Sequence, residues 1–349
     1  MTRMTISADD TAMLVLPHLR VQNANAISSP LTHGFPGITA FMGMMWALQR
    51  KLAAAAIPLK LHKVGVICHH HEEQVTSGYV KTFNLTRNPV NSSGASASIV
   101  EEGRMHLDIT LLFEVTQVAA QQTTLNEEAQ FADWATQIGE IVSRMRIAGG
   151  TVLPTPSMPG RRTRPWMAVL PDTHEKLRQA FALWRRQWLP GYALVGRDDL
   201  LKDRHRALCE QHPDSTLLDA WLHAARFNYR PVHEKKESEG SNKKFHWADP
   251  NRPKGGGWTV PIPVGYAALS KPLPAGSVAN ARDTTTPFVF VESVYSFGQW
   301  ISPHRLKHPY ELWWRAESDL EAGLYRCRSG YEHGESVAES AEEDLPEFE

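Results

Sequence analysis

The chain has 349 residues, of which 42% are hydrophobic and 11 are tryptophan, and its formal net charge is −1. This size and apolar content exclude a mostly disordered chain and predict a globular protein, long for one simple domain and short for three. The three cysteines are odd in number and far apart, which argues against a disulfide framework and favours a reducing compartment. We find no signal-peptide pattern and no apolar run long enough to cross a bilayer, so we expect a cytoplasmic protein without a membrane partner.

The total charge is near neutral, but acidic residues are concentrated at the C-terminal end of the chain. Eight acidic residues, and no Lys or Arg, follow residue 331. This composition predicts a disordered acidic tail over residues 332–349. The remaining chain carries more bases than acids, and a mildly basic body permits a nucleic-acid partner without requiring one.

The first half of the sequence predicts alternating strands and helices. Strands are expected over residues 12–21, 59–68, 105–115 and 151–153. Helices are expected over residues 37–54 and 125–148. This β-α-β-β-α-β order is the split βαβ pattern of ferredoxin-like and RNA-recognition folds. We therefore expect an α/β (α+β) protein in which residues 1–158 form a ferredoxin-like, RNA-recognition-like domain.

The connection between the second and third predicted strands, residues 69–104, is unusually long. Loops of more than about 15 residues are uncommon in compact domains and are usually functional. We expect a projecting hairpin here, a thumb, over about residues 72–104.

The second half is less regular and predicts a mixed C-terminal lobe over residues 159–331, which begins with a basic linker. Helices are expected over residues 172–188, 198–211 and 216–227. Strands are expected over residues 191–195, 258–266 and 287–295. Residues 232–257 are rich in Lys, Glu, Ser, Asn and Gly, which predicts a mobile insertion.

Several motifs occur together and in order. They are QNANAISSPLT at 22–32, FNLTRNP at 83–89, IVEEGR at 99–104, LPGYALV at 189–195, VPIPVGY at 260–266, NARD at 280–283 and SPHR at 302–305. By these motifs the chain, from about residue 10 to residue 327, resembles the Csy-two family, the Cas-five-type subunit of the type I-F CRISPR surveillance (Csy) complex. The charged insertion and the acidic tail depart from the family pattern.

The resemblance implies a non-catalytic subunit of antiviral defence that holds the 5′ handle of CRISPR RNA and uses no cofactor. It also implies pairing with the Cas-eight-type large subunit at one end of a Cas-seven-type backbone, with target DNA as a further candidate contact. The expected fold is an RNA-recognition-like domain with a thumb, in agreement with the periodicity. Two other functions stay open: a precursor-RNA endonuclease, as in some Cas-five-type relatives, and a scaffold that touches only protein.

The segment after the first predicted strand is the first candidate RNA site. Its neutral donors and acceptors suit the base edges of single-stranded RNA, and the N-terminus of the following helix attracts anions. Alone, this composition favours an ordinary turn-rich loop, and the resemblance reverses that preference. The candidates are Gln22, Asn23, Asn25, Ser28, Thr32 and His33, flanked by Arg20 and Arg50, which would meet phosphates or solvent.

The thumb and the C-terminal lobe supply further candidates. Lys81, Phe83, Arg87 and Asn88 combine cations, an aromatic ring and an amide, which suits a backbone clamp with base stacking. Phe83 alternatively anchors the hairpin to the core. We expect Glu101 and Glu102 to form a salt-bridged hairpin base with Arg87 or Arg104, although Arg104 is also an RNA candidate. In the C-terminal lobe, Arg282, His304 and Arg305 would contact handle phosphates or the large subunit.

The sequence completes neither a metal site nor a catalytic site. The run His69-His70-His71 with Glu72 and Glu73 contains metal-ligating residue types, but no Cys-x-x-Cys or nearby third segment completes a zinc site. No set of His, Lys and Tyr stands out for cleavage beside a 2′-hydroxyl. We therefore assign no metal ligand and no catalytic residue.

Overall fold

The structure is a computed structural model of the chain. It describes residues 11–87, 90, 93–95, 99–118, 127–226, 229–233, 245–249, 258–281 and 283–333. Two candidate site residues, Asn88 and Arg282, lie outside the described residues, as do most of the predicted insertion and the tail beyond residue 333.

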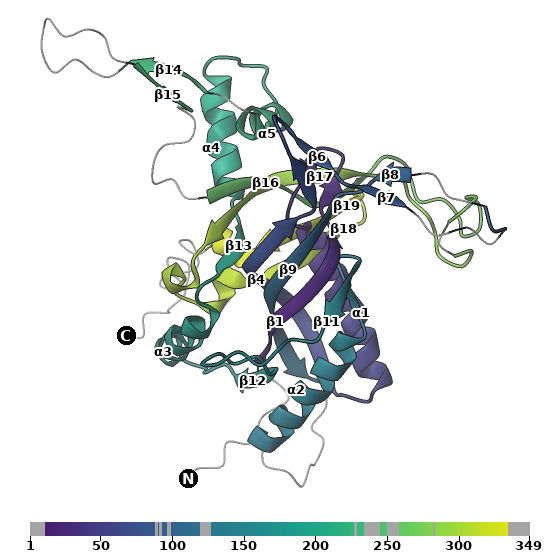
Figure 1. Ribbon diagram of the computed structural model, residues 1–349, viewed down its shortest axis with the longest axis vertical. Helices are drawn as coiled ribbons and strands as arrows, with labels where there is room; N and C mark the ends of the chain where they lie inside the picture. Colours follow the sequence, from purple (N-terminus) through teal and green to yellow (C-terminus); the bar gives the residue numbers. More distant parts are fainter. Residues whose placement is uncertain are drawn as a thin grey trace, which may run out of the picture.

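One antiparallel sheet of eleven strands runs through the described residues (Figure 1). Its order is β10-β11-β1-β9-β4-β13-β17-β16-β19-β18, with β12 beside β1. The bounds are β1 Thr11–Asn25, β4 Leu59–Glu73, β9 Arg104–Gln117, β10 Arg146–Ile147, β11 Gly150–Leu153, β12 Trp166–Val169, β13 Tyr192–Gly196, β16 Trp258–Ala268, β17 Val291–Ile301, β18 Trp314–Asp319 and β19 Leu324–Ser329. Four separate hairpins are β2 Ile27–Ser29 with β3 Thr32–His33, β5 Val75–Ser77 with β6 Lys81–Phe83, β7 Leu85–Arg87 with β8 Ile99–Glu101, and β14 Arg230–His233 with β15 Phe245–Ala248.

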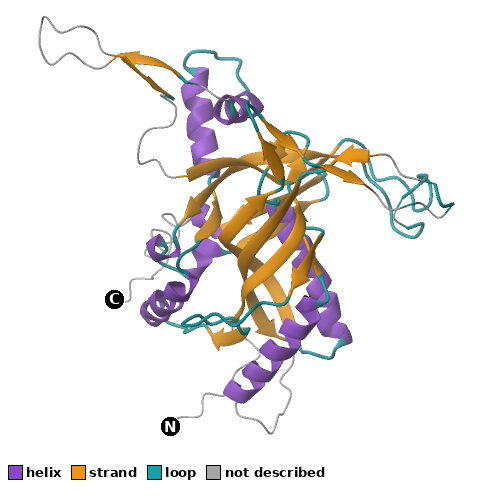
Figure 2. Cartoon of the chain, viewed as in Figure 1, coloured by secondary structure: helices purple, strands orange, loops and turns teal. Residues whose placement is uncertain are grey.

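Helices cover the outside of the sheet (Figure 2). They are α1 Ile38–Ala54, α2 Glu127–Ser143, α3 His174–Trp184, α4 Asp198–Cys209 and α5 Leu217–Ala225, with 3-10 turns η1 Arg185–Trp188, η2 Pro303–Arg305, η3 Pro309–Leu312 and η4 Gly330–His333. The predicted mixed α and β character is confirmed. The second predicted helix ends at Ser143 rather than at residue 148, because the chain turns there into the short strand β10. The strands β12, β18 and β19 were not predicted.

Two apolar cores lie on the two faces of the sheet. In β9, Leu107, Ile109 and Leu111 face the core beneath α1 and α2. Leu112 points the other way and packs with Leu177 and Phe181 of α3. This alternation follows from the period of two in a strand, so α1 and α2 lie on one side of the sheet and α3 on the other (Figure 1).

The far part of the sheet curls back on β4. Trp314 of β18 lies opposite Val64 of β4, so β4, β13, β17, β16, β19 and β18 form a closed ring of paired strands. The Trp314 indole is fully buried and its Nε1–H donates to the Leu194 carbonyl over 2.8 Å. Strands from both halves of the chain thus share one sheet.

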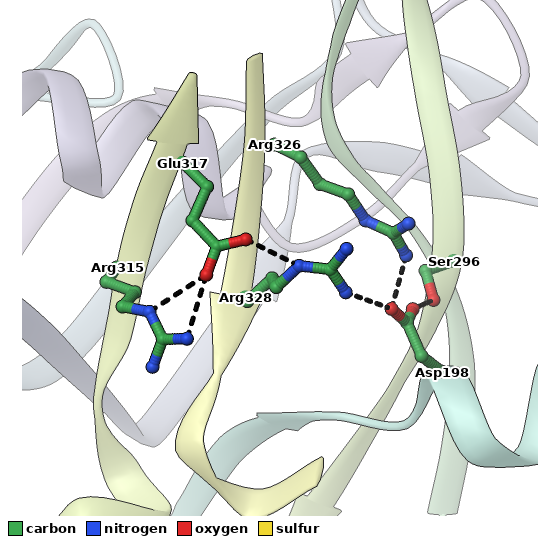
Figure 3. Close-up of polar contacts among 6 residues, drawn as sticks. All are labelled: Asp198, Ser296, Arg315, Glu317, Arg326 and Arg328. Carbon is green, nitrogen blue, oxygen red and sulfur yellow. Dashed lines mark hydrogen bonds and ion pairs between the residues drawn. The ribbon is translucent and has the colours of Figure 1, made fainter. Parts of the chain in front are cut away.

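A charged network fastens this ring to the start of α4. Figure 3 shows the Asp198 carboxylate between Ser296 of β17 and two arginines of β19. It accepts hydrogen bonds from the Ser296 hydroxyl and from Arg326, and it lies 3.4 Å from Arg328 Nη1. Arg328 Nε also donates to Glu317 over 2.7 Å, and Glu317 pairs with Arg315 over 2.8 Å. The network therefore joins α4 to three strands that are distant in sequence.

Candidate nucleic-acid interface

The face of the sheet opposite α1 and α2 changes character along β1. Near the start of β1 this face is apolar and lies beneath α3. Beyond the bulge at Leu16–Leu19, Arg20 lies opposite Asp108 of β9, and Asp108 lies opposite His70 of β4. We call this exposed half of the sheet the polar face. Its residues are Arg20, Gln22, His70, Glu72, Arg104, His106, Asp108, Arg146 and Thr151.

An open hollow of about 390 Å³ lies where the polar face meets the base of the thumb. Four carboxamides, two guanidinium groups and one carboxylate line it, with two further residues. The lining residues are Gln22, Asn23, Gln74, Asn84, Glu102, Arg104, Arg146, Gly149 and Thr151. The hollow brings together the predicted candidates Gln22, Asn23 and Arg104. It also contains Gln74, Asn84 and Arg146, which the sequence did not single out.

The end of β1 holds the first carboxamides in place. The structure extends β1 to Asn25, so Gln22 and Asn23 lie on a strand rather than in a loop. Asn23 has a positive φ of 58°, in the left-handed region that asparagine tolerates better than most residues. Its backbone N–H donates to His106 Nδ1 over 3.2 Å. Asn23 is one of the residues that line the hollow.

The other candidates of this segment bond within their own turn. Asn25 Nδ2 donates to the Ile27 carbonyl over 2.7 Å, and Asn25 Oδ1 accepts from the Ile27 N–H over 3.1 Å. The hydroxyl of Thr32 lies 2.9 Å from that of Ser28 and 2.6 Å from that of Ser29. Asn25, Ser28 and Thr32 therefore shape the β2–β3 hairpin. The N-terminus of α1 is also covered, because Gly37 is buried against Ser28 and Pro263.

The β2–β3 hairpin packs against the base of the thumb. The His33 ring lies 4.6 Å from the Phe83 ring, so Phe83 contacts the β2–β3 hairpin, and it belongs to neither of the two apolar cores. Gly103 is required at this contact, because a Cβ there would lie 2.5 Å from Ile27 and 2.9 Å from His33. Tyr79, at the tip of the β5–β6 hairpin, is fully exposed. The thumb thus has a packed base and an exposed aromatic ring at the tip of its β5–β6 hairpin.

The charged candidates are distributed unevenly. Arg104 donates twice to Glu102, over 2.9 and 2.7 Å, so the predicted salt bridge at the hairpin base is confirmed for this pair, while the side chains of Glu101 and Arg87 lie outside the described part of the structure. Lys81 is exposed and lies 3.4 Å from Glu73. Arg50 lies on α1, and His304 and Arg305 lie in η2, so none of these three lines the hollow. The backbone of Arg87 lies in β7, and its side chain is outside the described part of the structure.

Among the described residues, no group of three or more His, Cys, Asp or Glu is placed to hold a metal ion. Nor does any helix in the described ranges have the length and apolar content needed to cross a membrane.

A family model described as "CRISPR-associated protein (Cas_Csy2)" matches residues 14–327. The chain belongs to the Csy2 family. A similar relative is the "CRISPR-associated protein Csy2" of Pseudomonas aeruginosa (strain UCBPP-PA14), 40% identical over 321 residues, which cover 91% of this chain and 95% of the relative. The resemblance drawn from the motifs is therefore confirmed. Every residue of the polar face and of the hollow lies within the part that matches the Csy2 family.

Beneath the polar face of this Csy2-family chain lies a pair of stacked histidines. The rings of His18 and His69 are 4.2 Å apart, and only 2% of His18 is exposed. His69 Nδ1 lies 2.8 Å from the Pro190 carbonyl, which can only accept, so Nδ1 carries the proton. His69 Nε2 then accepts from the Thr110 hydroxyl over 2.8 Å, and His18 Nδ1 bonds to Asp108 over 3.0 Å. Both rings therefore form hydrogen bonds to other residues of the chain.

Lowering the pH is expected to destabilise this cluster. Burial lowers the pKa of His69 below its ordinary value of 6.5, so the unfolded chain binds a proton more readily than the folded one. The stability from neutral His69 is present above about pH 6.5 and is lost as the pH falls through the folded-state pKa. In urea unfolding at about pH 7.5 and about pH 5, His69→Gln should lose less stability on acidification than the parent. His70→Gln, at the exposed neighbouring position, should behave as the parent, and equal pH dependence in both variants would contradict the assignment.

Proposed function

We propose that this Csy2-family chain is a non-catalytic RNA-binding subunit of a type I-F CRISPR surveillance complex and holds the 5′ handle of CRISPR RNA on the polar face. In this proposal the chain pairs with the Cas-eight-type large subunit, beside a Cas-seven-type backbone subunit and near target DNA. The observation that carries the proposal is the hollow, where Gln22 and Asn23 of β1 meet Gln74 and Asn84 at the base of the thumb.

The composition of the hollow suits an unpaired base. A carboxamide offers both donors and acceptors, so four of them can match the Watson–Crick edge of a splayed base without adding charge. Arg104, which is held by two hydrogen bonds to Glu102, also lines the hollow. A guanidinium plane can stack on a base, as aromatic side chains do in RNA sites. The hollow thus combines edge recognition with a stacking surface.

Phosphates would be bound by arginines around the hollow. Arg20 and Arg146 are exposed, and within the part of the chain that the structure describes neither forms an ion pair with a carboxylate. Arg161 is close enough to His69 to affect its pKa, which places a third cation beside the polar face. In this proposal these arginines, and not the buried N-terminus of α1, bind the RNA phosphates.

The strand order supports a ferredoxin-like N-terminal domain within this proposal. The strands β1, β4, β9 and β11 correspond to the four predicted strands and lie in the order β11-β1-β9-β4, all antiparallel, with α1 and α2 on one face. This is the arrangement in which an RNA-recognition sheet leaves its opposite face free for RNA. The polar face is that free face. The projecting thumb, with Tyr79 at the tip of its β5–β6 hairpin, would close over the bound strand.

The endonuclease alternative has less support. Cleavage beside a 2′-hydroxyl needs a general base that can reach the RNA. The best-formed histidine cluster, His18 with His69 and Asp108, has one ring buried and both rings engaged in hydrogen bonds. The proposal therefore assigns these residues to the support of the polar face.

Crosslinking with mass spectrometry on the assembled complex tests the function. We expect RNA crosslinks in peptides that contain residues 20–23, 74–84 and 146–151, with the crosslinked nucleotides in the 5′ handle. A scaffold that touches only protein would give none at these positions, and that result would reject the proposal. Cleavage of repeat RNA by the purified chain would reject its non-catalytic part.

A further inference from the structure

The outer side of α1 carries features that the fold itself does not use. Gly43, Trp46 and Arg50 are three and four residues apart, so they lie along one side of the helix. All three are exposed, whereas Phe41, Met45 and Leu48 on the inner side are fully buried. We call the surface around Gly43, Trp46 and Arg50 the α1 outer face.

Aromatic residues from two strands extend this face. The Trp46 side chain lies close enough to the Tyr325 hydroxyl of β19 to act on the pKa of that hydroxyl. Tyr325 is in turn stacked with Tyr266 of β16, with ring centroids 6.3 Å apart and an angle of 26° between the planes. Trp46 is 44% exposed and Tyr266 is 40% exposed. The three rings therefore form one continuous surface, because each contacts the next.

Gly43 points to close approach by another molecule. Glycine in the middle of a helix costs about 0.5–1 kcal/mol relative to alanine. A Cβ at Gly43 would meet nothing within 4 Å, so packing within the described chain does not require a glycine at this position. The buried glycines differ, since a Cβ at Gly103 would clash. A helix position without a side chain, as at Gly43, allows a second helix to approach closely at that point.

The position of this face favours a protein over RNA as the occupant. Exposed aromatic and arginine side chains are the types that dominate protein–protein contacts. Arg50 and Lys51 form no ion pair with a carboxylate in the described ranges, so the end of the face is positively charged. The hollow lies on the opposite side of the sheet, because α1 covers the other core. One RNA strand in the hollow would not reach this face without passing around the sheet edge.

We propose that the α1 outer face docks a helix of another protein subunit, with a small or aliphatic side chain against Gly43 and an acidic side chain on Arg50. Trp46 and Tyr266 supply the apolar contact beside it. The inference rests on the proposed function only in that the chain is taken as a subunit of a protein complex. It assigns no role to the RNA site.

The sharpest test is Gly43→Gln, because the side chain has open space in the isolated chain and would block a docked helix. Glutamine is a better helix former than glycine, so the thermal midpoint of the variant should equal or exceed that of the parent. The labelled chain is titrated into the remaining protein subunits of the complex assembled on guide RNA. We expect Gly43→Gln and Trp46→Ala each to weaken incorporation at least about tenfold. Ala132→Gln, the same enlargement at an exposed position of α2, should change nothing.

A second measurement separates this inference from the RNA site. Binding of each variant to free guide RNA should equal that of the parent. Unchanged incorporation of both variants would overturn the inference. An equal loss of free-RNA binding would also overturn it in favour of an RNA contact, and self-association of the parent that Gly43→Gln abolishes would overturn it in favour of a second copy of this chain. Loss of incorporation with intact RNA binding supports it even if substitutions in the hollow prove silent.

Discussion

Replacing Asp198 by alanine is expected to lower the free energy of unfolding by about 3 kcal/mol, because it leaves buried or half-buried donors without an acceptor. The Asp198 side chain is only 9% exposed and accepts from Arg326 and from the Ser296 hydroxyl, which is fully buried. Its removal would leave Arg326 without a carboxylate of this network, and Arg328 would share Glu317 with Arg315 (Figure 3). Breaking a buried ion pair costs about 3–5 kcal/mol. The loss expected here lies at the lower end of that range, because Arg326 and Arg328 both retain partial access to water.

Urea unfolding followed by tryptophan fluorescence measures this loss as a shift in the midpoint at unchanged slope. Glu317→Ala is the matched control, because it removes a carboxylate of the same network that is 42% exposed. Exposed ion pairs contribute at most about 1 kcal/mol, so the control should move the midpoint much less. Equal losses in the two variants would show that burial of Asp198 is not what makes the network stabilising.

The elements with a regular period could be predicted from the sequence. The strands β1, β4 and β9 were found from apolar runs and alternation, and α1 was found from its apolar stripe, because each buries its side against one large core. The thumb was indicated by the length of the connection between β4 and β9 alone. These features depend on local composition, which a single sequence contains.

The ring closure could not be predicted in the same way. In β18, Trp314 is the only fully buried side chain, and Arg315, Glu317 and Asp319 give the segment the composition of an exposed loop. Its partner on β4, Val64, is 250 residues away in the sequence. The Asp198 network that holds β19 to α4 likewise joins residues with no local relation. Such long-range pairing leaves no periodic signal in either segment.

The candidate site was predicted in part. Gln22 and Asn23 were selected for their amide groups, and both line the hollow. Asn25 has the same amide group, but its carboxamide closes its own turn, and composition does not distinguish these two uses. Arg146 was missed because it fell within a predicted helix that in fact ends at Ser143. Gln74 joins the site through its backbone N–H, which donates to the Arg104 carbonyl at the start of β9.

Substitutions in the hollow are expected to lower the affinity for RNA. The double variant Gln22→Ala with Asn23→Gly should weaken binding of 5′-handle RNA by about 10- to 100-fold, because each lost base hydrogen bond contributes about 0.5–1.5 kcal/mol. Glycine is chosen at position 23 because the backbone φ there is 58°, where alanine would be strained and glycine is not. The change therefore removes a carboxamide without disturbing β1. Fluorescence anisotropy with labelled handle RNA, in the presence of the partner subunits, measures the affinity.

The salt dependence of binding separates base contacts from phosphate contacts. Amide hydrogen bonds to bases release no counterions, so the double variant should keep the parental slope of log affinity against log salt concentration. Arg146→Gln is the matched comparison from the same hollow, and it should reduce that slope by about 0.7 for one lost phosphate contact on a single strand. The double variant should also bind the natural handle and a handle with altered bases equally, because the groups that distinguish the bases are gone. A double variant that still discriminates between the two handles would place base recognition elsewhere, and it would leave the hollow as a backbone contact held by Arg146.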